Sequence, residues 1–575
     1  MNSANGQWAM NNGRLDHTGV IVSAGYGGGF IFRLLLRVVL LIALLSVIPP
    51  GARAQFFSSG QDPASIDWRE LHTPDFQVVY PEGFEPKAQY VANILDYAYS
   101  VGGNSLDHEP RKISVIIHNR GVVSNGFVAP APHRMELFST PPQDNQDTPW
   151  LEHLVIHEFR HVVQIDKLNQ GLTRVLGYIF GEQANAVVAG LVPMWFLEGD
   201  AVISETVLTR DGRGRLPSFT RNVRARLQDS ARLFSFDKML LGSYRDQTPN
   251  HYELGYHITS YGRRRFGTGI WQGVENHVAR RPYQLASFNL GLNRQTGLYS
   301  RDLYDSAMTY FDGLYTPSAN RGKKSPARPK PDDTLITPAN HPDYLSYRYP
   351  AFSKKYGLLA LRKDYSHLPR IVRITKTGAE KVHVPGPMTF EGFSAAGPLI
   401  AWSERVPDVR WNNRSYSVVK IYNMDSGHER TLQHKTRWFA PNLSPSGRKM
   451  VAVKVSLNNE YHLVVADVED GSVQRHLKHP RGLFLQQPVW SSSGKQIYVI
   501  GLTDQGKGLY RVNYQTGTWE TVMKPVYRQI SHLSPGNGRL FFRAAIGHKE
   551  QICALDTSTK NLYQVTRAEV NASDA

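Results

Sequence analysis

Residues 148–167 of the chain are TPWLEHLVIHEFRHVVQIDK, and this stretch decides the fold of the first half. Its apolar residues recur every three or four positions with no Gly or Pro inside the run, which predicts a helix. We expect Thr148 at the N-cap and Pro149 at the first helical position. On such a helix His157 and His161 fall on one face, where both imidazoles can reach one metal ion.

Two histidines at this spacing, with a glutamate directly after the first, are typical of a catalytic zinc site. Glu158 would stay off the metal and take a proton from a water molecule. Catalytic zinc usually has three protein ligands and one open position, so His157 and His161 need a third partner. The alternative interpretation is an amphipathic core helix that carries two surface histidines.

A second stretch follows, Trp195-Phe196-Leu197-Glu198-Gly199-Asp200-Ala201. Together with the histidine motif it resembles the gluzincin zinc peptidases, the class of aminopeptidase N. The resemblance implies that Glu198 is the third zinc ligand. It also implies that Glu205 supports a zinc-binding imidazole, a role that suits two helical turns of separation from Glu198. The alternative for Glu205 is an exposed helix carboxylate.

The gluzincin resemblance extends over residues 66–312. The family carries a Tyr-Glu-x-Gly segment whose tyrosine donates a hydrogen bond to the oxyanion, and this chain has Tyr252-Glu253-Leu254-Gly255. The resemblance therefore implies this role for Tyr252, with Tyr256 as the second choice. The chain departs from the family because more residues separate His161 from Glu198. We expect residues 172–192 to add a helical hairpin near the cleft.

The segments around the motifs predict a mixed sheet flanked by helices. The order is a strand at 76–80, a helix at 86–101 and a strand at 113–117. Residues 125–138 contain two prolines, which suits one edge strand that could pair with extended substrate, and Arg134 and Glu136 could then contact the substrate termini. The alternative is that these charges protect an exposed edge from aggregation. Further helices are expected at 219–227, 234–240, 252–266 and 271–279.

Residues 1–54 predict an export signal. Arg33 and Arg37 precede an apolar run at 38–48, and the small-x-small pattern at 52–54 would place the mature start at Gln55. The run is too short for a membrane span, so we expect no transmembrane helix in the mature chain. These features indicate export to the periplasm or the outside of a bacterial cell.

Residues 316–340 are rich in Pro and Lys and predict an extended linker. After it, a Ser, a short turn and a Gly recur at five places, with glycines at 357, 397, 447, 494 and 538. Their spacing of 40 to 50 residues is that of four-stranded propeller blades. These copies resemble the Tol-system propeller. Either the propeller closes with five blades, or the sequence is a truncated member of a family whose propellers have more blades.

The net charge of +17 attracts polyanions. Because the chain is predicted to be exported, an anionic envelope polymer or an envelope protein is the expected partner of the propeller, and nucleic acid is not. The chain contains one cysteine, Cys553, so no internal disulfide can form. Its setting between apolar residues predicts a buried strand.

These observations predict a multidomain protein: an α+β gluzincin-like metallopeptidase domain at 55–315 and an all-β propeller at 341–575. The predicted function is hydrolysis of peptide bonds in a peptide or protein substrate with a Zn²⁺ cofactor. The alternative is a catalytically inactive envelope scaffold that acts through its propeller. The sequence does not distinguish endopeptidase from exopeptidase action.

Overall fold

The structure is a computed structural model that describes residues 60–144, 147–228, 233–315, 341 and 343–574. The predicted export segment at 1–54, the mature start at Gln55 and the predicted linker at 316–340 lie outside these residues. They therefore stay predictions.

The first described part is a five-stranded mixed sheet with the strand order β1-β2-β3-β5-β4. Strands β2, β3 and β5 run parallel, whereas β1 and β4 pair antiparallel with their neighbours. The predicted strand-helix-strand order is confirmed. The elements are β1 (Trp68–His72), β2 (Phe76–Pro81), α2 (Glu85–Gly102), η1 (Asn104–Leu106), β3 (Ile113–His118), β4 (Asn125–Pro130) and β5 (His133–Phe138).

The prediction of one edge strand at 125–138 is wrong in its extent. The segment is a hairpin in which only β4 lies at the sheet edge, while β5 pairs with β3 on its other side. Proline can interrupt a strand, and here Pro132 lies in the turn between the two strands. Glu136 on β5 accepts a hydrogen bond from Arg134 and bonds to His118, so the two charged residues already pair within the protein. Their contact with substrate termini stays a prediction.

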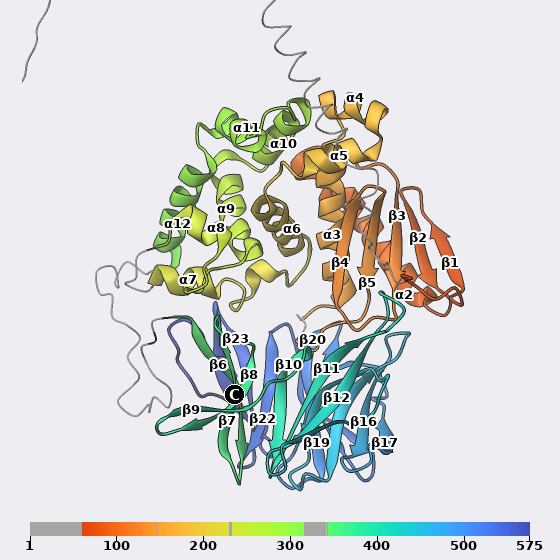
Figure 1. The fold of residues 1–575 in the computed structure, drawn as a ribbon, viewed down its shortest axis with the longest axis vertical. Helices are drawn as coiled ribbons and strands as arrows, with labels where there is room; N and C mark the ends of the chain where they lie inside the picture. Colours follow the sequence, from red (N-terminus) through yellow and green to blue (C-terminus); the bar gives the residue numbers. More distant parts are fainter. Residues whose placement is uncertain (1–59, 145–146, 229–232, 316–340, 342, 575) are drawn as a thin grey trace, which may run out of the picture. The chain divides into compact units, whose positions relative to one another are not determined.

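Helix α3 (Trp150–Lys167) carries the histidine motif and packs between the sheet and α6 (Met194–Leu208), as Figure 1 shows. The predicted cap is wrong by one residue, because Pro149 occupies the N-cap and Trp150 begins the helix. Proline there has an extended backbone with ψ of 138°, which the first helical position does not allow. The apolar face of α3 joins the largest core cluster of the described residues.

The remaining helices confirm the four predicted between residues 219 and 279, with ends that differ by a few residues. The predicted hairpin at 172–192 is the pair α4 and α5. Helices α11 and α12 were not predicted. The helices are α4 (Gly171–Phe180), α5 (Glu182–Ala189), η2 (Arg213–Arg215), α7 (Arg221–Gln228), α8 (Phe236–Leu241), α9 (His251–Phe266), α10 (Ile270–Arg280), α11 (Ser287–Thr296) and α12 (Ser300–Tyr315).

Helices α6 and α9 touch backbone to backbone where two glycines face each other. A Cβ atom on Gly255 would lie 1.8 Å from the carbonyl oxygen of Trp195, and one on Gly199 would lie 2.2 Å from the carbonyl carbon of Gly255. Only hydrogen fits at both positions. This contact fixes the distance between the helix that carries Glu198 and the helix that carries Tyr252.

Residues 345–564 form five four-stranded antiparallel sheets, each built from consecutive strands. This is the predicted propeller, with five blades in the described residues. The blades are β6 (Leu345–Ser353), β7 (Gly357–Asp364), β8 (Arg370–Thr375) and β9 (Gly378–His383); β10 (Met388–Ala396), β11 (Leu399–Pro407), β12 (Ser415–Asn423) and β13 (His428–Thr431); β14 (Trp438–Leu443), β15 (Lys449–Val455), β16 (Tyr461–Asp467) and β17 (Val473–Leu477); β18 (Phe484–Trp490), β19 (Gln496–Thr503), β20 (Gly506–Asn513) and β21 (Trp519–Val526); and β22 (Ile530–Gly536), β23 (Arg539–Ile546), β24 (Lys549–Asp556) and β25 (Leu562–Gln564).

The repeated Ser-to-Gly turns join the first and second strands of each blade. All five glycines have φ between 56° and 76°, which confirms the predicted reason for glycine at this place. A second regularity was not predicted. The first strand of four blades has a register shift beside a non-glycine residue of positive φ: Tyr349, Ala440, Gln487 and His532. Cys553 is buried in β24, as predicted.

Residues 60–575 form one compact unit. Within it, the segment 139–144 before α3 contacts two blades: the Gln487 side chain on β18 donates to Gln143, and the Arg543 guanidinium on β23 donates to Asp144. No single helix among the described residues combines the length and apolar composition that a membrane span needs.

Candidate metal centre

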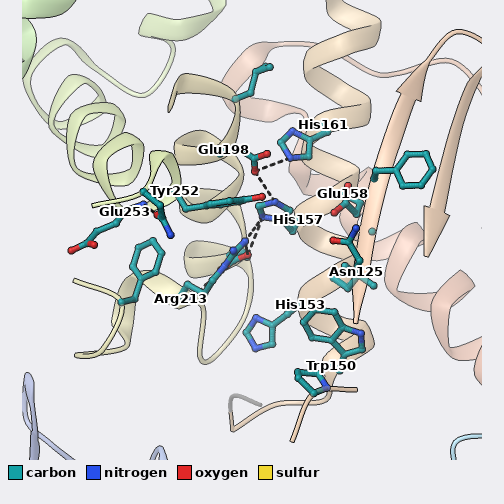
Figure 2. A pocket seen from close by; sticks show the side chains of 18 of the residues that line it. Asn125, Trp150, His153, His157, Glu158, His161, Glu198, Arg213, Tyr252 and Glu253 are labelled. Carbon is teal, nitrogen blue, oxygen red and sulfur yellow. Dashed lines mark hydrogen bonds and ion pairs between the residues drawn. The ribbon is translucent and has the colours of Figure 1, made fainter. Parts of the chain in front are cut away.

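Three ligand-type side chains converge from α3 and α6. Nε2 of His157 lies 3.2 Å from Oε2 of Glu198, and Nε2 of His161 lies 3.4 Å from the same oxygen. One ligand atom from each residue lies within 4.8 Å of the others (Figure 2). In the part of the chain that the structure describes, these three residues are the group of His, Cys, Asp and Glu side chains with the geometry of a metal site.

His157 is held by a carboxylate on its other ring nitrogen. Nδ1 of His157 lies 3.0 Å from Oε2 of Glu205, which is fully buried. A proton on Nδ1 leaves Nε2 free to face the ligand centre. The alternative of an exposed helix carboxylate at Glu205 is wrong, because α6 turns this side chain toward α3.

Arg213 holds Glu205 in turn. Its Nε and Nη2 donate to the two carboxylate oxygens at 2.7 Å and 2.8 Å, and its backbone N–H adds a third bond at 3.0 Å. Nη2 also lies 2.7 Å from Nδ1 of His157. When Nε2 of His157 faces the centre, its Nδ1 carries a proton and is a donor, as Nη2 of Arg213 is. The two donors therefore do not bond to each other; both donate to the carboxylate of Glu205. Burial alone would raise the pKa of Glu205, but Arg213 and His157 hold it well below its usual range.

His161 has an equivalent support. Its Nδ1 lies 2.9 Å from Oε1 of Gln164, one turn further along α3. The amide of Gln164 donates to the carbonyl of Leu197 and to Asp200, which fixes its orientation. The carbonyl oxygen of the amide therefore faces Nδ1, and Nε2 of His161 is directed to the centre.

The three converging groups favour a positive charge among them. Burial opposes ionisation of Glu198, but hydrogen bonds to His157 and His161 hold its pKa well below the usual range. Burial also disfavours the charged form of His161, yet Glu198 raises its pKa to about 9. At neutral pH this pKa favours the protonated, positively charged form of His161. Two imidazole nitrogens and one carboxylate oxygen are also the donor set that Zn²⁺ accepts, so the residues fit this ion.

Glu158 lies beside the ligand atoms without joining them. It is buried, and burial raises the pKa of its carboxyl group. Its Oε2 has no hydrogen-bond partner among the described residues. The edge strand β4 approaches so closely that a Cβ on Gly126 would lie 2.9 Å from Oε1 of Glu158. A carboxyl group with a free oxygen in a cavity can exchange a proton with a bound molecule.

Tyr252 on α9 points toward His157 and Glu198, as Figure 2 shows. Burial, followed by the negative charge of Glu198, raises the pKa of its hydroxyl to about 12, so the group keeps its proton and can donate. The Arg213 guanidinium lies 4.9 Å above the Tyr252 ring and holds it in place. Tyr256, the second choice, packs against Phe219 outside the lining of the cavity.

A cavity of about 660 Å³ surrounds these groups. One wall is the edge strand β4, and the opposite wall comes from α9 and the segment before α7. His153 also lines the cavity, one turn before His157, and burial lowers its pKa to about 4. Asp144, which contacts the propeller, lines it as well. Arg134 and Glu136 do not line this cavity.

Sequence reasoning missed Arg213, Gln164 and His153. Gln164 could have been predicted from the sequence, because a residue three positions after His161 lies on the same helix face. His153 lies four residues before His157 and could be found by the same spacing. Arg213 carries no sequence signal, because it belongs to the short turn η2 and meets α3 only in the folded chain.

No family model and no curated protein matches the chain. Among solved structures, the chain is similar to a putative TolB from Agrobacterium tumefaciens (18% identity, TM-score 0.31, covering 38% of this chain and 80% of that one). It is also similar to TolB from Acinetobacter baumannii (12%, 0.31, 38% and 53%) and to a nidogen/laminin complex (13%, 0.29, 38% and 78%). Likeness at these TM-scores carries no argument about function.

Proposed function

We propose that the chain is a zinc-dependent metallopeptidase of the gluzincin kind. The observation that carries the proposal is the convergence of Nε2 of His157, Nε2 of His161 and Oε2 of Glu198, with a supported imidazole on each side. Bound zinc supplies Lewis acidity, which lowers the pKa of water and polarises a carbonyl group.

In this proposal the side chains of the protein transfer protons, stabilise the oxyanion and bind the substrate backbone. Glu158, with one oxygen free of partners, takes a proton from the attacking water and returns it to the leaving amine. The Tyr252 hydroxyl donates to the oxyanion that develops on the scissile carbonyl, a contribution of about 3 kcal/mol for such donors. The free edge of β4 offers backbone groups to an extended peptide.

The proposed substrate class is therefore peptide or protein. The propeller is proposed to bind a protein or an anionic polymer of the cell envelope and to influence access to the cavity, because the segment with Asp144 touches both. Export to the periplasm or the outside of the cell remains part of the proposal.

The test has two readouts that separate the site from the reaction. Purified protein is loaded with zinc, dialysed, and analysed for metal and for cleavage of a peptide library. We expect one bound zinc, its loss in His157→Ala and Glu198→Ala, and retention of zinc with loss of cleavage in Glu158→Gln. Glu152→Gln, on the same helix, is the matched control and should keep both.

Equal cleavage by Glu158→Gln and the unchanged protein would reject the mechanism. Absence of bound zinc after loading would reject the site and favour the scaffold alternative, in which the propeller acts without catalysis.

A further inference from the structure

The hairpin formed by α4 and α5 exposes large apolar side chains on one stretch of chain. Tyr178 is 83% exposed, Ile179 68%, Phe180 63% and Val187 72%. Residues 171–194 contain only two charged side chains, Arg174 and Glu182. Exposed apolar residues gathered in this way mark a surface that binds something apolar.

Three arginines and one glutamate lie on the hairpin or beside it. Arg280, at the end of α10, packs against the start of α4 beside Gly171, and Arg281 follows it. Among the described residues, Arg174, Arg280 and Arg281 make no ion pair, whereas Glu182 accepts a hydrogen bond from the backbone N–H of His133. An apolar surface with basic residues at its border complements an anionic lipid bilayer.

A cavity of about 380 Å³ lies between the hairpin and the turn of β4 and β5. Arg174, His133, Tyr178 and Asn185 are among its lining residues. Asn185 is only 8% exposed, and its Oδ1 has no partner among the described residues; the same is true of Nε2 of His133. The Arg174 guanidinium and the His133 imidazole suit a phosphate group, while the carboxylate of Glu182, which also lines the cavity, and the amide oxygen of Asn185 suit hydroxyl groups of a lipid headgroup.

We propose that the hairpin of α4 and α5 is a membrane-binding element that inserts Tyr178, Ile179 and Phe180 into an anionic phospholipid bilayer, while the adjacent cavity takes a headgroup. Insertion at the interface needs no spanning helix, and a short helix with one apolar face lies about 5–10 Å deep in the headgroup region. Figure 1 shows α4 and α5 at one margin of the helical region, next to α10.

This element adjoins the metal centre along the chain. The residue that begins α6, Met194, follows the hairpin and lines the catalytic cavity while remaining half exposed. A bilayer bound by the hairpin would bring substrates attached to the membrane close to this cavity. The proposal does not depend on catalysis, since it rests on residues outside the metal centre.

The experiment is vesicle flotation with the exported protein, after its first residue has been determined, because the apolar run at 38–48 would itself bind lipid. Vesicles contain phosphatidylcholine with phosphatidylglycerol at roughly a 7:3 ratio, or phosphatidylcholine alone. We expect binding to the anionic vesicles, and a roughly tenfold or greater loss in the double variant Ile179→Ser with Phe180→Ser. The matched control is Leu241→Ser with Tyr244→Ser, which removes side chains that are 83% and 98% exposed elsewhere.

Two further measurements separate the parts of the proposal. Arg174→Gln should weaken binding to anionic vesicles more than to neutral ones, whereas Arg265→Gln should not. A Tyr178→Trp variant should lose fluorescence with brominated lipid if this position enters the bilayer.

Equal flotation of the hairpin variant and its control would overturn the proposal, as would absence of binding to either vesicle. Self-association that the hairpin variant abolishes, without binding to vesicles, would also overturn it and assign the surface to a protein contact.

Discussion

The helical region and the propeller both combine apolar clusters with buried ion pairs, but they place those pairs differently. Around α3 and α6 the buried residues include the ion pairs of Arg160 and Arg263 with Asp200 and of Arg213 with Glu205. The blades pack through apolar clusters and carry the buried ion pairs of Arg543 with Glu550 and of His532 with Asp574. Buried ion pairs often stabilise a fold less than apolar residues of the same volume would. In the helical region these pairs lie where the candidate ligands converge, because Asp200 also holds Gln164 and Glu205 holds His157.

The largest expected effect comes from breaking the Asp200 network. Asp200 is fully buried and accepts from Arg160 at 2.6 Å and from Arg263. Asp200→Asn leaves two buried guanidinium groups without a counter-charge and should lower the free energy of unfolding by about 3–5 kcal/mol. Urea unfolding followed by circular dichroism at the helical signal measures the change.

The propeller supplies the control. Asp425→Asn removes the partner of Lys355 in an exposed turn, where solvent screens the pair, so no measurable change is expected. Similar losses in both variants would contradict the contrast between the buried pairs of Asp200 and the exposed pair of Asp425.

The second effect is the dependence of the free energy of unfolding on pH, which is expected to have opposite signs for a buried histidine in each region. His257 on α9 is fully buried, and burial lowers its pKa to about 4. The unfolded chain binds a proton at this residue near pH 6.5, so stability falls as the pH drops from about 6.5 to 4, by about 3 kcal/mol in total. His257→Gln should be less stable at neutral pH and should lose less on acidification, as measured by urea unfolding across this range.

In the propeller, His532 responds in the other direction. Burial opposes its charged form, but Asp144 and Asp574 outweigh burial and raise its pKa. This contribution is present at low pH and is lost as the pH rises through the folded pKa. His532→Gln should therefore cost more stability at pH 5 than at pH 8. The same pH profile for the variant and the unchanged protein would contradict the assignment.

The smallest effect concerns the turn glycines of the blades. Gly397 has φ of 56° and open space around its Cα, so a methyl group meets no atom and only backbone strain remains. Gly397→Ala should destabilise the propeller by about 1 kcal/mol. Amide hydrogen exchange of β10 and β11 measures this local change. An effect several times larger would mean that the blade turns are packed as tightly as the helices.

These contrasts explain which features could be predicted from the sequence. The blade turns are local: Ser and Gly lie within a few residues of each other and repeat five times, so the strands beside them follow. His157 and His161 are also local, since helical spacing brings them together. The positive φ of Tyr349 and Gln487 could not be predicted, because these residue types do not favour it and the neighbouring strands impose it.

The support of the metal centre is a different case. Glu205 was predicted through the family resemblance, and the structure places it against His157. Arg213 could not be found, because its contact with Glu205 needs the turn after α6 to fold back on that helix. The predicted extent of the edge strand was wrong for a related reason. Prolines indicate where a strand is interrupted, but they do not show which of the two resulting strands pairs with neighbours on both sides.

The glycine contact between α6 and α9 limits which related sequences can carry this site. Gly199 and Gly255 allow the two helices to touch, and side chains at either place would push Glu198 and Tyr252 apart. A collection of sequences that share the histidine spacing can therefore be sorted by these two positions. Members with a larger residue at either position are expected to lack the metal geometry described here, even when all three ligand residues are present.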